Sequence, residues 1–488
     1  GITSITLPSG DDNVLTIHTN DGTERFRVDS SGNVKVGSAA TISPDGDVFF
    51  TGVTTATTFT GAHSGSGANL TSLPSAQLSG ALPAISAASL TNVPAANVVG
   101  VHTSLTVTNA TTTGTAVVGG GVTISESGIE ASGIGITCAN INGGQISGRR
   151  NIIINGAMQV AQRDTSAVTI PAGKTVTDVD RFGQWTKTGE GSWKSGQQVA
   201  DAPDGFQYSR KITSLAANTI TSNSYHSIRY AAEGFDVKQL NCGFSSAKTV
   251  TLSFYVKSSL TGTFGLNFTN AANTRSYPVS YTISSADTWE QKIITLTLDT
   301  SGTWPTTNAV GLEINWKLAM GSSYDVSSLN QWQNNWRFPE NTVNILATNG
   351  ATFQLTGVQL ELGSQATAFE HRSMSEELAL CERYCLTLCR GQQYIGTCML
   401  YNSLTHTAAM VWKTTMRAAP TMVANSGGDY YITYRNSGQV TYNSLDGTSL
   451  VSENGGAIYT ANGTGTAGHA GAIAGANANT LVLLTAEL

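Results

Sequence analysis

One short run of the sequence combines aromatic and amide side chains in the way that sugar-binding sites do. The run is WQNNW, and its residues are Trp332, Gln333, Asn334, Asn335 and Trp336. A further tryptophan, Trp304, lies in a second loop-like stretch before a proline. Aromatic faces stack on pyranose rings, and neighbouring amides hydrogen-bond to sugar hydroxyls. These residues are therefore candidate glycan ligands, although a β-sandwich core could also absorb each tryptophan.

A cluster of tyrosines near the C-terminus forms a second candidate binding surface. Its members are Tyr430, Tyr431, Tyr434 and Tyr442. Tyrosine offers an aromatic face together with a hydroxyl, so it suits the same sugar chemistry.

Catalytic chemistry has less support in the sequence. Glycoside hydrolysis needs two carboxylates about 5 to 9.5 Å apart. The glutamates that could supply such a pair are Glu313, Glu361, Glu370, Glu376 and Glu377. Glu376 and Glu377 suit the first turn of a helix, and the histidines His226, His371 and His406 are scattered without a G-x-S-x-G motif. We therefore expect no catalytic residues and no enzymatic activity.

Six cysteines in 488 residues do not make a disulfide framework. The four near the end of the chain are Cys381, Cys385, Cys389 and Cys398. The first three are four residues apart and lack the C-x2-C turn of zinc ribbons, so packing is the preferred interpretation. The sequence predicts neither a metal nor a cofactor.

The sequence predicts one helix, over residues 373–390. An alternating strand over residues 352–362 precedes it, Ser373 or Ser375 can cap it, and Gly391 follows its end. Four residues at spacings of 3, 4 and 3 form an apolar seam: Leu378, Cys381, Cys385 and Leu388. The helix either docks on its own domain or forms a three-helix collar in a homotrimer, and the sequence leaves both interpretations open.

The stretch VQLELGSQATAFEHRSMSEELALCERYC resembles the junction near the distal end of many phage tail fibre proteins. In that family a strand is followed by ATPFEHR and then EELALCxRY. A second block, RRNIIINGAMQVAQR at residues 149–163, resembles the start of the same module. The resemblance covers residues 151–385. It implies a receptor-binding fibre, a jelly roll similar to carbohydrate-binding modules, and a structural corner at Glu370, His371 and Arg372.

Residues 151–372 hold the bulky core formers, with seven of the eight tryptophans. Alternating strands separated by Gly, Asn, Ser and Asp loops predict a two-sheet sandwich, and a jelly roll suits its size. Residues 391–488 are again β-rich and are expected to form a small C-terminal tip domain. The predicted fold class is therefore mostly β, with one short helix.

Residues 1–150 contain neither Trp nor Tyr and are expected to form an elongated shaft. Residues 1–68 repeat a unit of a turn followed by a strand, in which Asp45-Gly46-Asp47 is more often a hairpin turn than a Ca²⁺ site. Residues 69–150 carry a 20-residue repeat with prolines at 74 and 94. Such a segment is either disordered or wound with two identical chains into a thin trimeric shaft.

The composition excludes several partners. Charged residues make up 12% of the chain and the formal net charge is -6, so no polycationic surface for nucleic acid exists. No run of 18 apolar residues and no N-terminal charged-then-apolar segment occurs, so membrane insertion is not expected. Because Gly1 stands where an initiator Met would, the chain is interpreted as a possible fragment.

The sequence thus predicts a homotrimeric tail fibre, located in the virion, that binds a host cell-surface glycan without cleaving it. Other virion tail proteins are expected partners. Two alternatives stay open at this point: a glycan-degrading tailspike, and a purely structural virion fibre.

Overall fold

The computed structural model describes residues 14–60 except 39, 52, 54, 56 and 59, three short strands between 116 and 131, and residues 149–488 except 191, 192 and 437. Contacts divide the chain into two compact units, residues 1–111 and 112–488. The 20-residue repeat lies outside the described residues. No helix in the described part of the chain is long and apolar enough to cross a membrane.

Unit 1 contains an antiparallel meander of five strands. They are β1 (Leu15–His18), β2 (Glu24–Val28), β3 (Val34–Val36), β4 (Ala40–Ile42) and β5 (Val48–Phe50). The Ser43 amide donates to the Asp47 carbonyl at 2.8 Å across Gly46, which has a φ of 94°, so the hairpin-turn interpretation is confirmed. Among the described residues of 14–60 none is buried. This sheet therefore has no hydrophobic core of its own.

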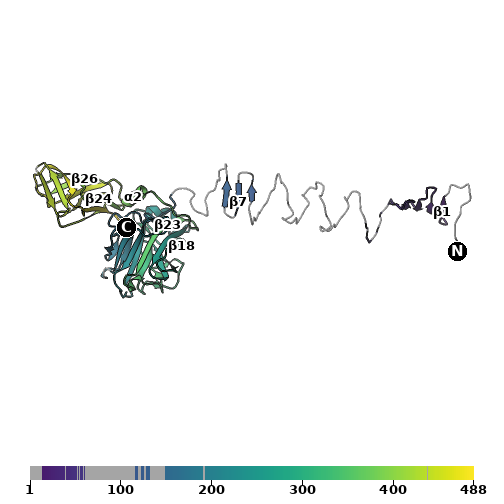
Figure 1. Ribbon diagram of the computed structural model, residues 1–488, viewed down its shortest axis with the longest axis horizontal. Helices are drawn as coiled ribbons and strands as arrows, with labels where there is room; N and C mark the ends of the chain where they lie inside the picture. The colour runs from purple at the N-terminus through teal and green to yellow at the C-terminus, as the bar shows by residue number, and fades with distance from the viewer. Residues whose placement is uncertain are drawn as a thin grey trace. The chain divides into compact units, whose positions relative to one another are not determined.

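Unit 2 begins with a three-stranded antiparallel sheet, formed by β6 (Ala116–Val118), β7 (Val122–Ser125) and β8 (Gly128–Ala131). A large β-sandwich follows, so the predicted sandwich is confirmed. Its first layer, sheet A, has the order β10-β11-β14-β19-β16-β17-β21. Its second layer, sheet B, has the order β18-β15-β23-β13-β12-β9, and β18 and β23 are labelled in Figure 1.

All pairings within the two layers are antiparallel. The strands of sheet A are β10 (Gly173–Thr175), β11 (Phe182–Thr186), β14 (Tyr225–Glu233), β16 (Gly262–Thr269), β17 (Arg275–Ile283), β19 (Val310–Met320) and β21 (Gln333–Asn334). Those of sheet B are β9 (Val168–Thr169), β12 (Lys194–Val199), β13 (Ser209–Ser214), β15 (Thr249–Ser258), β18 (Glu290–Thr297) and β23 (Thr352–Leu362). Short elements join them: α1 (Gly234–Val237), η4 (Lys238–Leu240), β20 (Asp325–Val326), β22 (Phe338–Pro339) and η5 (Ile345–Ala347).

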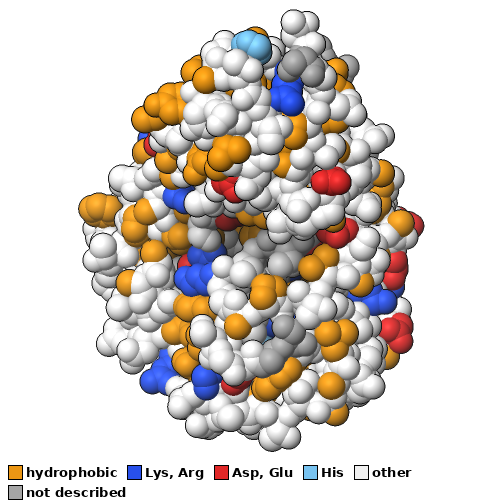
Figure 2. Space-filling view, turned by 90° about the vertical axis from the view of Figure 1, so that its left-hand side faces the viewer, with side chains coloured by type: hydrophobic (Ala, Val, Ile, Leu, Met, Phe, Trp, Pro, Cys, Tyr) orange, Lys and Arg blue, Asp and Glu red, His pale blue; other side chains and the backbone are white. Residues whose placement is uncertain are grey.

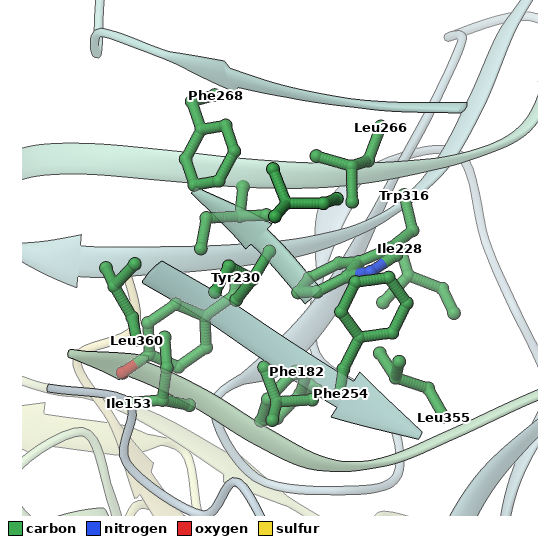
Figure 3. Packing of buried hydrophobic residues seen from close by; sticks show 14 of the residues in the cluster. Ile153, Phe182, Ile228, Tyr230, Phe254, Leu266, Phe268, Trp316, Leu355 and Leu360 are labelled. Atoms are coloured by element: carbon green, nitrogen blue, oxygen red, sulfur yellow. The ribbon is translucent and has the colours of Figure 1, made fainter. Parts of the chain in front are cut away.

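The sandwich core follows from the period-2 alternation of its strands. Ile228, Phe254 and Trp316 point between the layers and are fully buried, as Figure 3 shows from close by. A buried ion pair also lies between the layers. The Arg210 guanidinium donates to both carboxylate oxygens of Asp178 at 2.9 and 2.7 Å, and neither side chain is exposed.

The predicted helix is shorter than expected. Helix α2 spans Met374–Glu382, and Ser373 caps it through a reciprocal capping box with Glu376. Residues Cys385–Arg390, expected to continue it, instead form strand β24, which pairs with the strand Leu481–Thr485. The helix prediction was wrong here because pairing with a strand from the chain's end outweighs the helical spacing of the apolar residues.

The seam residues therefore do not form one helical stripe. Cys381 lies on α2 and Cys385 on β24, and both are fully buried within this chain. Leu378 packs beside a cluster that contains Ile154 and Cys381, while Leu388 packs into the C-terminal part. The docking of α2 on its own chain, one of the two interpretations, is what these contacts show.

The C-terminal part is β-rich, as predicted. Two sheets form it: β24-β33-β27, and sheet C with the order β29-β28-β32-β25-β26-β31-β30. Their strands after β24 are β25 (Tyr394–Leu400), β26 (His406–Val411), β27 (Thr421–Ala424), β28 (Tyr431–Arg435), β29 (Gly438–Tyr442), β30 (Gly447–Ser449), β31 (Gly455–Thr460), β32 (Ala470–Gly475) and β33 (Leu481–Thr485).

The two blocks that carry the family resemblance lie in direct contact. The Glu370 carboxylate accepts from the Arg150 and Asn151 amides at 3.1 and 2.8 Å. Arg372 donates to the Asn151 carbonyl and, at 3.0 Å, to the Ile153 carbonyl. Glu370 and Arg372 thus act as a structural corner, as the resemblance implied.

Candidate functional site

The loop tryptophans are mostly packed inside the protein. Trp304 and Trp336 are only 8% and 7% exposed, so the structure contradicts the expectation that they present open ligand faces. Trp332 is half-buried; its Nε1 donates to the Thr297 carbonyl at 2.8 Å, and its ring meets Trp304 edge-on at 5.4 Å. Burial of these rings against the sandwich is the physical reason for the correction.

The amides between these tryptophans support the loop. Gln333 donates to the Ser328 carbonyl, and Asn334 accepts from Arg275, both at 2.8 Å. Asn335 has a φ of 68°, and its carbonyl accepts from Ser276 at 2.6 Å. Asn334 and Asn335 are exposed, but the structure does not bring them beside an open aromatic face of the run.

Trp336 belongs to an aromatic cluster on the outer face of sheet A that the sequence analysis did not single out. Its ring centroid lies 4.3 Å from that of Trp185, and Tyr225 and Tyr324 pack edge-on at 5.5 and 5.3 Å. These partners come from β11, β14 and the loop before β20. Because they are far apart in the sequence, only the strand order of sheet A could have revealed the cluster.

Another part of the outer face of sheet A carries a group of charged side chains that pair with one another. Glu313 pairs with Arg229 at 2.6 Å and with Lys174 at 3.2 Å. Burial alone would raise the pKa of Glu313, but these two cations outweigh it and hold the pKa below its ordinary value. The Leu488 carbonyl accepts from Arg229 at 2.6 Å, so Leu488 lies against this charged group.

The outer face of sheet B, in contrast, is hollowed into a pocket of about 430 Å³, here named the sheet B groove. Ser253 and Tyr255 of β15 and Gln291 of β18 form its floor. The loops 204–206 and 366–371 form its two walls. Its size falls within the range of about 300 to 1,000 Å³ that holds small ligands.

Aromatic rings line the groove. The ring centroid of Phe206 lies 5.5 Å from Tyr255, 4.9 Å from Phe369 and 5.3 Å from His371. His371 is exposed, and Phe206, Tyr255 and Phe369 are half-buried. Phe206, Tyr255 and Phe369 carried no sequence signal beyond their aromatic type, and His371 was interpreted only as part of the corner.

A glycine sets the approach of two of these rings. Gly357 interrupts β23 with a φ of 59°, next to a register shift in its pairing with β15. A Cβ atom at this position would lie 2.8 Å from both Phe206 and Tyr255. The bulge therefore makes room for the ring pair, as bulges beside binding sites commonly do.

The wall at 366–369 is held in place by polar contacts. The Thr367 amide and hydroxyl donate to the two Glu361 oxygens at 2.8 and 2.6 Å. Arg150 donates to the Thr367 hydroxyl at 3.0 Å. Asp204 and Gln291 remain exposed at the groove, where they offer an acceptor and an amide to a ligand.

The five glutamates considered for catalysis have structural partners. Glu313, Glu361 and Glu370 make the contacts described above, and Glu376 caps α2. Glu377 accepts from the Asn155 amide at 2.5 Å and from Arg372 at 3.3 Å. His226 and His406 are buried, so among the three histidines only His371 reaches the groove.

The C-terminal tyrosines divide into buried and open members. Tyr431 and Tyr442 are buried and stack at 6.0 Å, which contradicts their expected role as exposed ligand contacts. Tyr430 is half-buried. Tyr434 is 42% exposed and lies 5.8 Å from Tyr394, an exposed residue that the sequence analysis did not select.

The C-terminal cysteines are all buried, and burial raises the pKa of each thiol. In the described part of the chain no three or more His, Cys, Asp or Glu side chains gather as metal ligands do. The sulfurs therefore contribute as small apolar groups to the clusters around α2 and sheet C.

No protein-family model matches this sequence, and no curated protein matches it. Among solved structures, the enzymatically active domain of bacteriophage CBA120 tailspike protein 4 is 13% identical, with a TM-score of 0.23 over 43% of this chain. The matched part spans only 21% of that tailspike chain.

Carbohydrate-binding modules are also among the matched structures. The family 11 module of Clostridium thermocellum is 14% identical over 41% of this chain and 99% of that one, with a TM-score of 0.22. The CBM22-1 xylan-binding domain of Paenibacillus barcinonensis Xyn10C is 10% identical over 42% and 99%, with a TM-score of 0.18. At these scores none of the three supports a functional inference for this chain.

Proposed function

We propose that this protein is a phage tail fibre component that attaches the virion to a host bacterium by binding a cell-surface glycan in the sheet B groove. The observation that carries the proposal is the partly exposed ring set of Phe206, Tyr255, Phe369 and His371 beside polar side chains in an open pocket. Stacking on such rings with hydrogen bonds at the edge is how sugars are held. The family resemblance of residues 151–385 supplies the biological setting.

Binding without cleavage is part of the proposal. The carboxylate in the groove is Asp204, while Glu361 behind the wall is occupied by Thr367. Hydrolysis of a glycosidic bond needs two carboxylates that flank it. We therefore expect the protein to release no sugar from the polysaccharide it binds.

A homotrimer is a further part of the proposal, and the energetics of sugar binding support it. One shallow sugar site gains only about 4 to 6 kcal/mol, which corresponds to millimolar to high-micromolar affinity. Three linked sites raise the effective concentration, and avidity can exceed single-site affinity about 10²-fold or more. The coreless sheet of unit 1, with Phe49 and Phe50 60% and 54% exposed, favours identical chains as its partners.

The surface suits adhesion that does not depend on charge. Figure 2 shows one face on which Lys, Arg, Asp and Glu occupy only a small part of the surface. With 12% charged residues in the whole chain, attachment through rings and hydroxyls should persist in moderate salt.

A pull-down on host envelope fragments tests the proposal. Phe206→Ala should reduce adsorption of the full chain strongly, whereas Phe244→Ala, which removes a 62% exposed ring elsewhere on the sandwich, should not. Melting curves of both variants show whether folding is preserved. Equal adsorption of wild type and folded Phe206→Ala, or release of sugar products by wild type, would contradict the proposal.

A further inference from the structure

The sheet B groove has a neighbouring pocket. A second pocket of about 610 Å³ lies beside α2, and His371 lines both it and the sheet B groove. Arg149, Ala379 and Leu380 also line this second pocket. Each pocket alone is large enough for a small ligand, so the two together exceed what one sugar unit needs.

The second pocket has few polar groups available to a ligand. Arg372 and Glu370, which also line it, are engaged in the corner with Asn151. Arg149 donates through Nε to the Asn151 carbonyl at 3.4 Å, and its terminal nitrogens have no hydrogen-bond partner among the described residues. One oxygen of Glu376 accepts from Ser373, which leaves the other without a hydrogen bond to the described part of the chain.

The available chemistry is therefore balanced in charge. Arg149 offers donors, Glu376 offers an acceptor, and the exposed Ala379 with the half-buried Leu380 provides an apolar floor. A donor and an acceptor beside an aliphatic surface match the hydroxyls and the ring face of an uncharged sugar. An acidic sugar would be attracted by the positive charge of Arg149 but repelled by the negative charge of Glu376.

We infer that the receptor is bound as an extended, uncharged oligosaccharide of at least two units, one against Phe206 and Tyr255 and the next in the second pocket, with His371 between them. The inference rests on the proposed function and adds the substrate class to it. A terminal monosaccharide would use only the sheet B groove. A chain uses both pockets, so affinity increases with chain length.

Two variants that each fill one pocket separate the contributions of the two pockets to binding. Ala368 and Ala379 are exposed and line the sheet B groove and the second pocket, respectively, so a tryptophan at either position fills the space without removing a buried contact. Ala409→Trp, at an exposed position of β26 outside both pockets, is the matched control. Melting curves and particle mass accompany each variant.

The experiment measures binding of the full chain to size-graded neutral oligosaccharides of one to six units, from glucose, xylose, mannose and N-acetylglucosamine. For the series that binds, affinity should increase at least about tenfold from one to three units. Ala379→Trp should remove this increase and leave the single-unit affinity unchanged. Ala368→Trp should remove binding at every length, and Ala409→Trp should change nothing.

Four results would overturn the inference. Equal affinity for one and three units, or an unchanged length dependence in Ala379→Trp with an unchanged particle mass, would restrict the site to the sheet B groove and leave the proposed function standing. Loss of trimer mass in Ala379→Trp without loss of the length dependence would assign the second pocket to contacts between copies. Absence of binding in every series would contradict the proposed function itself.

Discussion

Gly357 is the residue on which the shape of the sheet B groove depends. Its φ of 59° is strained for any residue with a Cβ, and that Cβ would lie 2.8 Å from Phe206 and Tyr255. The ring pair and the strand bulge are therefore coupled through one backbone position.

Gly357→Ala should lose roughly 1 to 2 kcal/mol from the backbone conformation and should also displace the ring pair, which weakens glycan binding. Gly350→Ala is the matched control, since Gly350 has a φ of 75° and a Cβ added there would meet no atom within 4 Å. Unfolding and glycan binding are measured on both variants, which separates the effect of backbone strain from the effect of displacing the ring pair. Equal binding by the two variants would mean that the rings do not depend on Gly357.

A second residue-scale test concerns the ion pair inside the sandwich. Asp178→Ala leaves Arg210 charged and unpaired between the sheets, so the free energy of unfolding should fall by about 3 to 5 kcal/mol. Asp201→Ala, which breaks the more exposed pair with Lys257, should cost about 0 to 1 kcal/mol. Denaturant unfolding measures both, and similar losses would contradict the burial of the Arg210 pair.

At the scale of elements, helix α2 shows how an N-terminal cap positions a junction. Ser373 accepts from the Glu376 amide while Glu376 accepts from the Ser373 amide, which fixes where the helix begins after the corner. Both Ser373 and Ser375 suit the cap by residue type, and the structure shows that Ser373 is the cap.

Ser373→Ala should lower the free energy of unfolding by about 1 kcal/mol, within a range of roughly 0.5 to 2. Ser375→Ala, two residues further on, should change it by less than about 0.5 kcal/mol. Chemical denaturation of the two variants gives the comparison. A larger loss in Ser375→Ala would show that Ser373 is not the cap.

The elements that could be predicted from the sequence are those whose residues carry a local pattern. Strand β23, the sandwich class and the start of α2 follow from alternation and capping residues. Strand β24 did not follow, because its partner β33 comes from the far end of the chain and its apolar spacing also suits a helix. The groove was missed for a similar reason: Phe206, Tyr255 and Phe369 meet only through the order of strands in sheet B.

The prediction that the tryptophans contact a ligand was wrong for a different physical reason. A tryptophan beside amides is equally suited to a sugar and to a loop that folds back on a sandwich, and burial decides between them. Trp304 and Trp336 are buried, while Trp185 packs against Trp336 from β11 without any local signal.

At the scale of the molecule, buried carboxylates connect the sandwich with the C-terminal part. Glu487 pairs with Arg181 at 2.7 Å and Arg163 at 3.1 Å, and Glu233 pairs with Arg383 at 2.6 Å. Burial alone would raise the pKa of both glutamates, but the arginines lower it below the ordinary 4.5.

Because these pKa values are depressed in the folded state, the stability they contribute is present above pH 4.5 and is lost as the pH falls below it. Glu487→Gln should lower stability by about 3 to 5 kcal/mol at neutral pH, since it leaves Arg181 without its charge partner and Arg163 paired with Asp180 alone, and should reduce the loss in acid. Unfolding measured from pH 7 to pH 3 checks this. If the stability of the variant fell in acid as steeply as that of wild type, the contribution assigned to the Glu487 ion pairs would be contradicted.

The assembled particle provides a test of the trimer. Light scattering or native mass spectrometry of the full chain should give three times the chain mass. Residues 1–150 alone, at low concentration, should be unfolded by circular dichroism, because the described sheet of residues 14–60 has no buried residue to offset roughly 1 to 2 kcal/mol of backbone entropy per residue. A folded monomer of either form would contradict the trimeric shaft.

The most direct test of glycan binding is a crystal structure of the protein soaked with the oligosaccharide that binds best. We predict sugar density stacked on Phe206 and Tyr255 and continuing past His371 towards Ala379. Density confined to the Trp185 cluster on sheet A, or to Tyr394 and Tyr434 of sheet C, would contradict the assignment of the sheet B groove as the receptor site.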